Sequence, residues 1–374
     1  MLIFESRPDF IDEILHRIAA DLQITEAQHA KAENRYFAIG NVLRGNGSIL
    51  AAFDPLISSQ GSLLLGTTLR PDGKREYDLD LLCRLAIDSR SIPRPSILLD
   101  WTESVLRAHG TYETMVEHKR FSRCVRVRYR DEFHLDIVPC CPDGGNGAIW
   151  LPDRDSEEWR PGNPKLYAQW FEGRARVTML EAMKKAIDPL PGYEPADRKL
   201  PLQRAVQLVK RWRDVVFRDD PEAAPSSTVL TTLAALHYGG QPSVYDALAR
   251  ILAGIVVSLP EVGRLQVLNP IDSREDLSEA WDANHGAYQK FAARITQFKQ
   301  AWRELCDVKG QDEISDRVAQ LFDSASPGLV LKAQAAAVNR MKQSRALGVR
   351  SSGRLTAVST PGSILDRPGR HFGG

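Results

Sequence analysis

The runs GSLLLGTTLR (residues 61–70) and YDLDLL (residues 77–82) decide the fold of this chain. Residues 57–60 before the first run have the character of a short strand, and Gly61-Ser62 is typical of a tight turn into a short helix. A helix start presents free backbone N–H groups, which bind anions such as phosphate. The second run predicts a strand that carries Asp78 and Asp80 on one face.

Two carboxylates on one strand face can bind divalent cations. Positions i and i+2 of a strand lie about 6.5 Å apart on one surface, so Asp78 and Asp80 can converge on a pair of ions. The alternative is a solvated edge strand with two surface aspartates, because such pairs are common. The spacing alone leaves both interpretations open.

A later hairpin supplies a third carboxylate. The runs VRVRYR (125–130) and FHLDIV (133–138) alternate and predict antiparallel strands. On the second strand His134 and Asp136 share the face opposite the apolar residues. Burying a lone carboxylate is costly, so Asp136 must be paired, bound to metal or at the rim of the sheet. We expect Asp136 to complete the site and His134 to have a packing or positioning role.

The rest of the chain is predicted to be mostly helical. Ile11–Ala19 has helical spacing, Thr25 and Gln28 suggest a capping box, and 153–164 resembles a charged loop that leads into a helix over 167–185. Prolines at 189, 191, 195 and 201 predict a domain boundary near residue 190. Further helices are expected over 202–217, 229–238, 244–258, 278–305 and 313–341.

Composition limits the classes of function. Lys and Arg total 49 and Asp and Glu total 48 among 374 residues, so the net field does not attract nucleic acid or anionic membrane. No apolar run approaches the roughly 18 residues of a membrane span, and the first residues are charged. The five cysteines show no CxxC spacing, which predicts neither disulfides nor zinc. We expect a cytoplasmic protein with reduced cysteines.

Together the Gly-Ser turn and the three aspartates indicate nucleotidyl transfer. This chemistry needs two divalent ions, and hard cations such as Mg²⁺ prefer oxygen ligands. Lys210 either reaches a triphosphate or is a solvated helix lysine, and Ser226-Ser227-Thr228 either only cap a helix or also contact a nucleotide. The sequence therefore predicts a two-metal site beside a phosphate-binding turn.

The motifs QGSLLLGTTLRP, YDLDLLCRL and FHLDIVP resemble those of the bacterial cGAS/DncV-like nucleotidyltransferases (CD-NTases) of CBASS antiphage systems. PLQRAVQLVKRWRDVVF, SSTVLTTLAALHY and VLNP extend the resemblance from about residue 55 to 305. It implies an α+β, polymerase-β-like fold: a nucleotidyltransferase core with an N-terminal helical lead-in (1–190), a helical nucleotide-binding domain (191–342) and an active-site cleft between them. Residues 343–374 are expected to be a flexible tail.

The resemblance also implies a function. Such enzymes make cyclic di- or trinucleotides from triphosphates such as ATP and GTP without a template, here a purine product such as cyclic GMP-AMP. Carried over by residue, Asp78, Asp80 and Asp136 would be catalytic and bind two Mg²⁺ ions, with Mn²⁺ as a substitute. The donor nucleotide would contact Gly61, Ser62, Lys210 and Ser227.

The expected partners follow from the same resemblance. No insertion resembles a zinc ribbon for DNA, so no stable nucleic-acid partner is expected. The lack of a long apolar run predicts no membrane partner. The product would reach a downstream effector. Gly374 would be joined to other molecules by a partner resembling ubiquitin-transfer enzymes, unless the tail is an idle end. The alternatives are a nucleotidyltransferase that modifies RNA or protein, and a nucleotide-binding regulator without catalysis.

Overall fold

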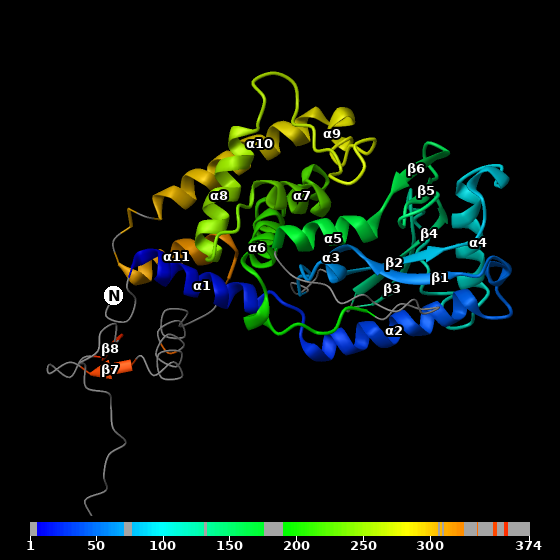
Figure 1. The fold of residues 1–374 in the computed structure, drawn as a ribbon, viewed down its shortest axis with the longest axis horizontal. Coiled ribbons are helices and arrows are strands. Elements are labelled where there is room, and N and C mark those ends of the chain that lie inside the picture. The colour runs from blue at the N-terminus through cyan, green and yellow to red at the C-terminus, as the bar shows by residue number, and fades with distance from the viewer. Residues whose placement is uncertain are drawn as a thin grey trace, which may run out of the picture.

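The structure of the chain is a computed structural model, drawn as a ribbon in Figure 1. It describes residues 6–70, 77–130, 133–175, 190–305, 307–308, 310–324, 335, 347–349 and 355–357. The larger strands gather on one side of the molecule and most of the helices on the other (Figure 1). We call these parts the sheet lobe and the helical lobe. The fold is therefore α+β, with a mixed sheet beside a lobe built from helices, as predicted.

The sheet lobe is built on six strands. In chain order they are β1 (Leu56–Gln60), β2 (Tyr77–Arg84), β3 (Val125–Tyr129), β4 (Phe133–Pro142), β5 (Ile149–Asp153) and β6 (Glu158–Gly162). The strand order is β1-β2-β4-β5-β6, and β3 also pairs with β4. The β2–β4 pair is parallel, whereas β1–β2 and β3–β4 are antiparallel. The predicted β3–β4 hairpin is confirmed, and the β5–β6 hairpin lies where the sequence predicts mostly loop.

One face of this sheet is covered by helices. The helices α2 (Glu26–Arg44) and α4 (Ser96–Arg107) pack with a 3₁₀ helix (Ile49–Phe53) against the apolar residues of β2 and β4. Leu79 and Leu135 are buried in this core. Because strand side chains alternate between faces, the aspartates of β2 and β4 lie on the opposite face. The capping box predicted at Thr25 is present at the start of α2.

The helical lobe surrounds α6. Its helices are α1 (Arg7–Asp21), α5 (Pro164–Ala175), α6 (Pro201–Val216), α7 (Ser227–His237), α8 (Val244–Val257), α9 (Ala280–Ala283), α10 (His285–Glu304) and α11 (Gln311–Leu321). Trp212 of α6 stacks on Phe298 of α10, with ring centroids 4.8 Å apart. The helix predicted over 278–305 is interrupted at Asn284, whose side-chain oxygen accepts a hydrogen bond from Ala287 and begins α10.

Two features differ from the predicted domain division. The apolar residues of α1, including Phe10 and Ile14, are buried in the core of the helical lobe, although the sequence assigns this helix to the first domain. Within the predicted flexible tail, β7 (Leu347–Val349) pairs with β8 (Leu355–Ala357) in an antiparallel arrangement. Composition alone did not indicate this pair, because its strands are very short.

Short elements connect the larger ones. They are α3 (Gly61–Leu64) and 3₁₀ helices at Ser89–Ser91, Ala196–Arg198 and Pro221–Ala223. Among the described residues no helix is long and apolar enough to cross a membrane. Four cysteines, at 83, 124, 140 and 141, are described and carry free thiols. The helices predicted over 167–185 and 313–341 are described only up to residues 175 and 324, and again at residue 335. The rest of these two segments and Gly374 lie outside the described residues.

Candidate active site

The parallel register of β2 and β4 brings the three predicted carboxylates to one place. Asp80 lies beside Asp136, and Asp78 lies beside His134. On the other side of β2, Gln60 at the end of β1 is the register partner of Asp80. The residue that follows Gln60 begins α3, so the Gly-Ser turn starts next to the carboxylates.

Gly61 is the point of contact between the turn and the carboxylates. Its φ is +66°, in the left-handed region that favours glycine. A Cβ atom at this position would lie 1.9 Å from Oδ2 of Asp80. Only glycine therefore allows the backbone of the turn to approach Asp80 this closely.

The carboxylates influence one another electrostatically. Burial raises the pKa of Asp80 to about 7, and the negative charges of Asp78 and Asp136 add to the effect. Burial also acts on Asp78, but a hydrogen bond and the charge of His134 outweigh it and lower the pKa of that carboxyl. Unlike Asp78, Asp80 is therefore a carboxylate whose ionised form needs a nearby positive charge for stabilisation.

Basic side chains at present pair with the other two carboxylates. Nε and Nη2 of Arg126 donate to Oδ1 and Oδ2 of Asp136 at 2.6 and 2.7 Å. The guanidinium lies over the ring of Phe121, 4.3 Å from its centroid, and His134 contacts Asp78. Among the described residues no group of three or more His, Cys, Asp or Glu side chains is arranged to hold a metal ion.

The donor set nevertheless fits a divalent cation. Three carboxylates supply the oxygen ligands that Mg²⁺ and Mn²⁺ prefer. Burial and the repulsion from Asp78 and Asp136 raise the pKa of Asp80, and the charge of a bound cation would oppose both effects. Asp78, Asp80 and Asp136 would hold the ions, with Arg126 and His134 giving up their present carboxylate partners.

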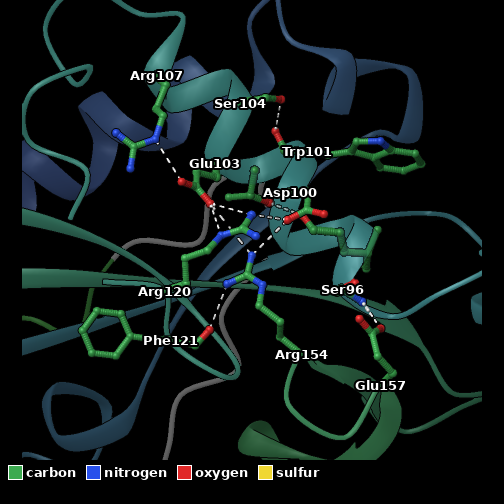
Figure 2. Close-up of polar contacts among 12 residues, drawn as sticks. Ser96, Asp100, Trp101, Glu103, Ser104, Arg107, Arg120, Phe121, Arg154 and Glu157 are labelled. Carbon is green, nitrogen blue, oxygen red and sulfur yellow. Dashed lines mark hydrogen bonds and ion pairs between the residues drawn. The ribbon is translucent and has the colours of Figure 1, made fainter. Parts of the chain in front are cut away.

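Ion pairs join the segment around Phe121 to α4 (Figure 2), and the ring of Phe121 lies under Arg126. Arg154 donates to the backbone oxygen of Phe121 at 3.0 Å and to Asp100 of α4 at 3.1 Å. Arg120, next to Phe121, contacts Asp100 and Glu103 of the same helix. Arg120 and Arg154 thus both connect the backbone at Phe121 to α4, which fixes the ring under Arg126.

A cavity of about 260 Å³ lies between the two lobes. We call it the central cavity. Five of the seven predicted site residues line it, namely Gly61, Ser62, Asp80, Lys210 and Ser227, whereas Asp78 and Asp136 are not part of its lining. The turn, one carboxylate and two residues of the helical lobe thus face the same space.

The structure also explains how α6 positions the turn. Lys210 is buried, and its Nζ donates to the backbone oxygen of Thr67 at 3.1 Å. Gln203 and Gln207 lie on the same face of α6 and donate to Leu65 and Thr68. Burial lowers the pKa of Lys210 to about 8, and the charge of Arg213 contributes. Lys210 is therefore a buried lysine of the cavity wall and not a solvated one.

The predicted site residues Ser62 and Ser227 also lie in the wall of the central cavity. Ser226 caps α7, because its Oγ accepts from the backbone N–H of Val229 at 3.2 Å. Ser227 is the first residue of α7, and its Oγ accepts from Arg213 at 2.8 Å. Ser62 shares a hydrogen bond with Thr68. Capping therefore belongs to Ser226 and leaves Ser227 facing the cavity.

The chain is similar to proteins of known name. Residues 11–174 match the family described as the Second Messenger Oligonucleotide or Dinucleotide Synthetase domain. A protein named c-di-GMP synthase, from Roseivirga ehrenbergii, is 29% identical over 381 residues and covers 100% of both chains. The cyclic dinucleotide synthase CdnG of Bradyrhizobium diazoefficiens is 24% identical over 388 residues, covering 95% of this chain and 91% of CdnG. The chain is thus a nucleotidyltransferase that is similar over its whole length to a named cyclic dinucleotide synthase.

Solved structures show the same fold as this nucleotidyltransferase. The structure of CdnG from Bradyrhizobium diazoefficiens in complex with GTP has a TM-score of 0.69 and 20% identity, covering 88% of this chain and 98% of that chain. The Escherichia coli CdnC structure with ATP has a TM-score of 0.62 and 16% identity, covering 83% and 97%. The polymerase-β-like fold predicted from the sequence is thereby confirmed.

Sequence reasoning missed one part of the nucleotidyltransferase site. Asn163, Tyr167, Asn269 and Glu275 also line the central cavity. Tyr167 shares a hydrogen bond of 2.8 Å with Thr232 of α7. These residues come from separate segments, so no spacing in the sequence connects them with the aspartates. The available signal was the family resemblance, which covers the segments that contain Asn163, Tyr167 and Asn269.

Proposed function

We propose that this nucleotidyltransferase joins nucleoside triphosphates into a cyclic oligonucleotide without a template. A ribose hydroxyl oxygen attacks the α-phosphorus of a triphosphate, the bond from that phosphorus to the bridging oxygen breaks, and pyrophosphate leaves. The observation that carries the proposal is the central cavity, in which Gly61, Ser62, Lys210 and Asp80 face one space. Phosphate-directed groups and a carboxylate are thus placed together, as this reaction requires.

The carboxylates perform the central task in this proposal. Asp78, Asp80 and Asp136 would hold two divalent ions, Mg²⁺ or Mn²⁺, which would lower the pKa of the attacking hydroxyl and neutralise charge on the leaving pyrophosphate. Asp136 completes the site and helps to take the proton of the attacking hydroxyl. His134 orients Asp78 through their contact.

The remaining predicted residues bind the triphosphate. The close backbone approach at Gly61 leaves room for phosphate oxygens, and the hydroxyl of Ser62 adds a donor. The pKa of Lys210 is about 8, so its ammonium group is mostly protonated at pH 7 and attracts phosphate. Arg213 holds the hydroxyl of Ser227 at the cavity wall.

The nature of the product is a finer proposal. Two relatives are named for cyclic dinucleotide synthesis, one of them for c-di-GMP, and solved neighbours hold GTP or ATP. These names support a cyclic product that contains purines. A role of this product as a second messenger in antiphage defence rests on the family resemblance of the sequence alone. We propose ATP and GTP as the substrates. Conjugation through Gly374 stays a prediction from the sequence.

Product analysis tests the proposal. The protein is incubated with each labelled triphosphate, alone and in pairs, with Mg²⁺ or Mn²⁺, and the mixture is treated with phosphatase and separated by chromatography. We expect a small phosphatase-resistant product that requires Asp80 and is lost in Asp80→Asn. The matched control is Asp54→Asn, because Asp54 is exposed and its side chain is distant from the carboxylates in sequence and register.

Two outcomes would contradict the proposal. If label enters RNA or protein in place of a small product, the enzyme is a macromolecule-modifying nucleotidyltransferase. If no pair of triphosphates is consumed and Asp80→Asn leaves the biological effect unchanged, the protein is a nucleotide-binding regulator without catalysis.

A further inference from the structure

The central cavity contains a carboxylate that the proposed chemistry does not use. Glu275 lies in the segment between α8 and α9, which belongs to the helical lobe, and it lines the same cavity as the Gly-Ser turn. The other acidic lining residue is Asp80 on the sheet. Glu275 is thus an acidic group contributed by the lobe opposite the metal-binding strands.

The side chain of Glu275 is held in place by Asn269. Nδ2 of Asn269 donates to Oε2 of Glu275 at 2.6 Å. The backbone N–H of Asn269 donates to the backbone oxygen of Glu275 at 2.8 Å, and a β-bridge joins Leu268 with Asp276. Asn269 itself is 6% exposed, and its Oδ1 accepts from Ile271 at 3.0 Å. The carboxylate is therefore presented by a rigid local structure.

One oxygen of this carboxylate is left to interact with a ligand. Within the described part of the chain, no hydrogen-bond donor contacts Oε1 of Glu275. Burial raises the pKa of Glu275, while the Asn269 hydrogen bond opposes this effect. Leu151 and Leu277 line the same cavity. An ordered acceptor beside apolar side chains is the arrangement that recognises the polar edge of a flat ring.

We propose that Glu275 reads the base of the nucleotide in the central cavity and selects guanine. Guanine offers N1–H and a 2-amino group side by side, and the carboxylate can accept both hydrogen bonds, one at Oε1 and one at the second lone pair of Oε2, whose first lone pair accepts from Asn269. Adenine instead presents the unprotonated N1, whose lone pair would face the carboxylate oxygen. This inference rests on the proposed function, because it assumes that the phosphates of the same nucleotide lie at the Gly-Ser turn.

The expected discrimination follows from the number of hydrogen bonds. A bidentate contact to a base edge is worth a preference of roughly 10- to 100-fold. Inosine triphosphate keeps N1–H but lacks the 2-amino group, so its affinity should lie between those of GTP and ATP. Three nucleotides that differ only at the base edge thus separate the two predicted hydrogen bonds.

Nucleotide binding tests the inference without relying on turnover. Dissociation constants for non-hydrolysable analogues of GTP, ATP and inosine triphosphate are measured by calorimetry with Mg²⁺. We expect the wild type to prefer GTP over ATP by roughly 10- to 100-fold. In Glu275→Gln the side-chain amide replaces one acceptor by a donor, so GTP binding should weaken while ATP binding should change by less than about threefold. Glu261→Gln, an exposed position of the same segment, is the matched control.

Each result has a distinct meaning. If Glu275→Gln keeps the wild-type ratio of GTP to ATP affinity, or loses affinity for both nucleotides equally, the role of Glu275 in base selection is refuted. The proposed function survives that result as long as the wild type still forms its cyclic product. If the wild type binds none of the analogues and forms no product, the proposed function itself fails. Inorganic triphosphate, which has no base, should bind wild type and variant equally.

Discussion

Gly61 gives the sharpest test of the active-site geometry. In Gly61→Ala the added Cβ would lie 1.9 Å from Oδ2 and 2.8 Å from Cγ of Asp80. To separate the Cβ from Oδ2 by the 3.4 Å of ordinary contact, the turn or the Asp80 side chain must move by about 1.5 Å. A misplacement of about 1 Å can cost roughly 100-fold in rate. We therefore expect the rate of pyrophosphate release to fall at least about 100-fold.

The same substitution should have only a moderate effect on the fold. An alanine in the left-handed region costs about 1–3 kcal/mol, which urea unfolding followed by circular dichroism would measure. Gly173→Ala is the matched control, because this glycine lies in α5 and a Cβ there would meet nothing within 4 Å. The control should keep the wild-type rate. A Gly61→Ala enzyme within about threefold of the wild-type rate would refute the close approach of the turn to Asp80.

Two further predictions concern ion pairs. In Arg126→Gln the mostly buried Asp136 loses its cationic partner, so the free energy of unfolding without divalent ions should fall by roughly 3 kcal/mol. Mg²⁺ should then raise the thermal midpoint more in this variant than in the wild type; equal increases would contradict the assignment of Asp136 as a metal ligand. Asp153 is buried, which raises its pKa, but hydrogen bonds from Arg123 and Ser122 lower it to about 2. A carboxyl group whose pKa is lowered in the folded protein stabilises the fold at pH values above its ordinary pKa of 3.8. This stabilisation is lost as the pH falls toward 2. Asp153→Asn should thus cost about 2 kcal/mol at pH 7 and less at pH 3 in urea unfolding; an equal cost at both pH values would be inconsistent with this pairing.

Local patterns predicted much of the fold. The alternation of β2, β3 and β4, the capping box at Thr25 and the helical spacing of α6 are short-range signals that the structure confirms. The helix start at Gly61 differs slightly, because the prediction began the helix at Leu63. The position of α1 depends on contacts with α8 and α11 that are distant in sequence, so no local pattern indicated its lobe.

The site was predictable where chemistry follows spacing. Asp78 and Asp80 are two residues apart, and their common face follows from the strand period. The placement of Asp80 beside Asp136 needs the parallel register, which the sequence does not specify. The alternation over residues 125–130 places Arg126 on a predicted strand, but its pairing with Asp136 became visible only in three dimensions. Glu275 carries no motif, so its place in the central cavity required the structure.

The position of α1 has a consequence for how the chain folds during synthesis. The sheet lobe is formed by residues from Glu26 to Gly162, so it can bury its core while later residues are still being made. By contrast, α1 contacts α6, α8 and α11, so the packing of its apolar side chains, such as Phe10 and Ile14, is complete only after α11 has left the ribosome. The first helix to be made is thus among the last to become protected from aggregation or chaperone binding.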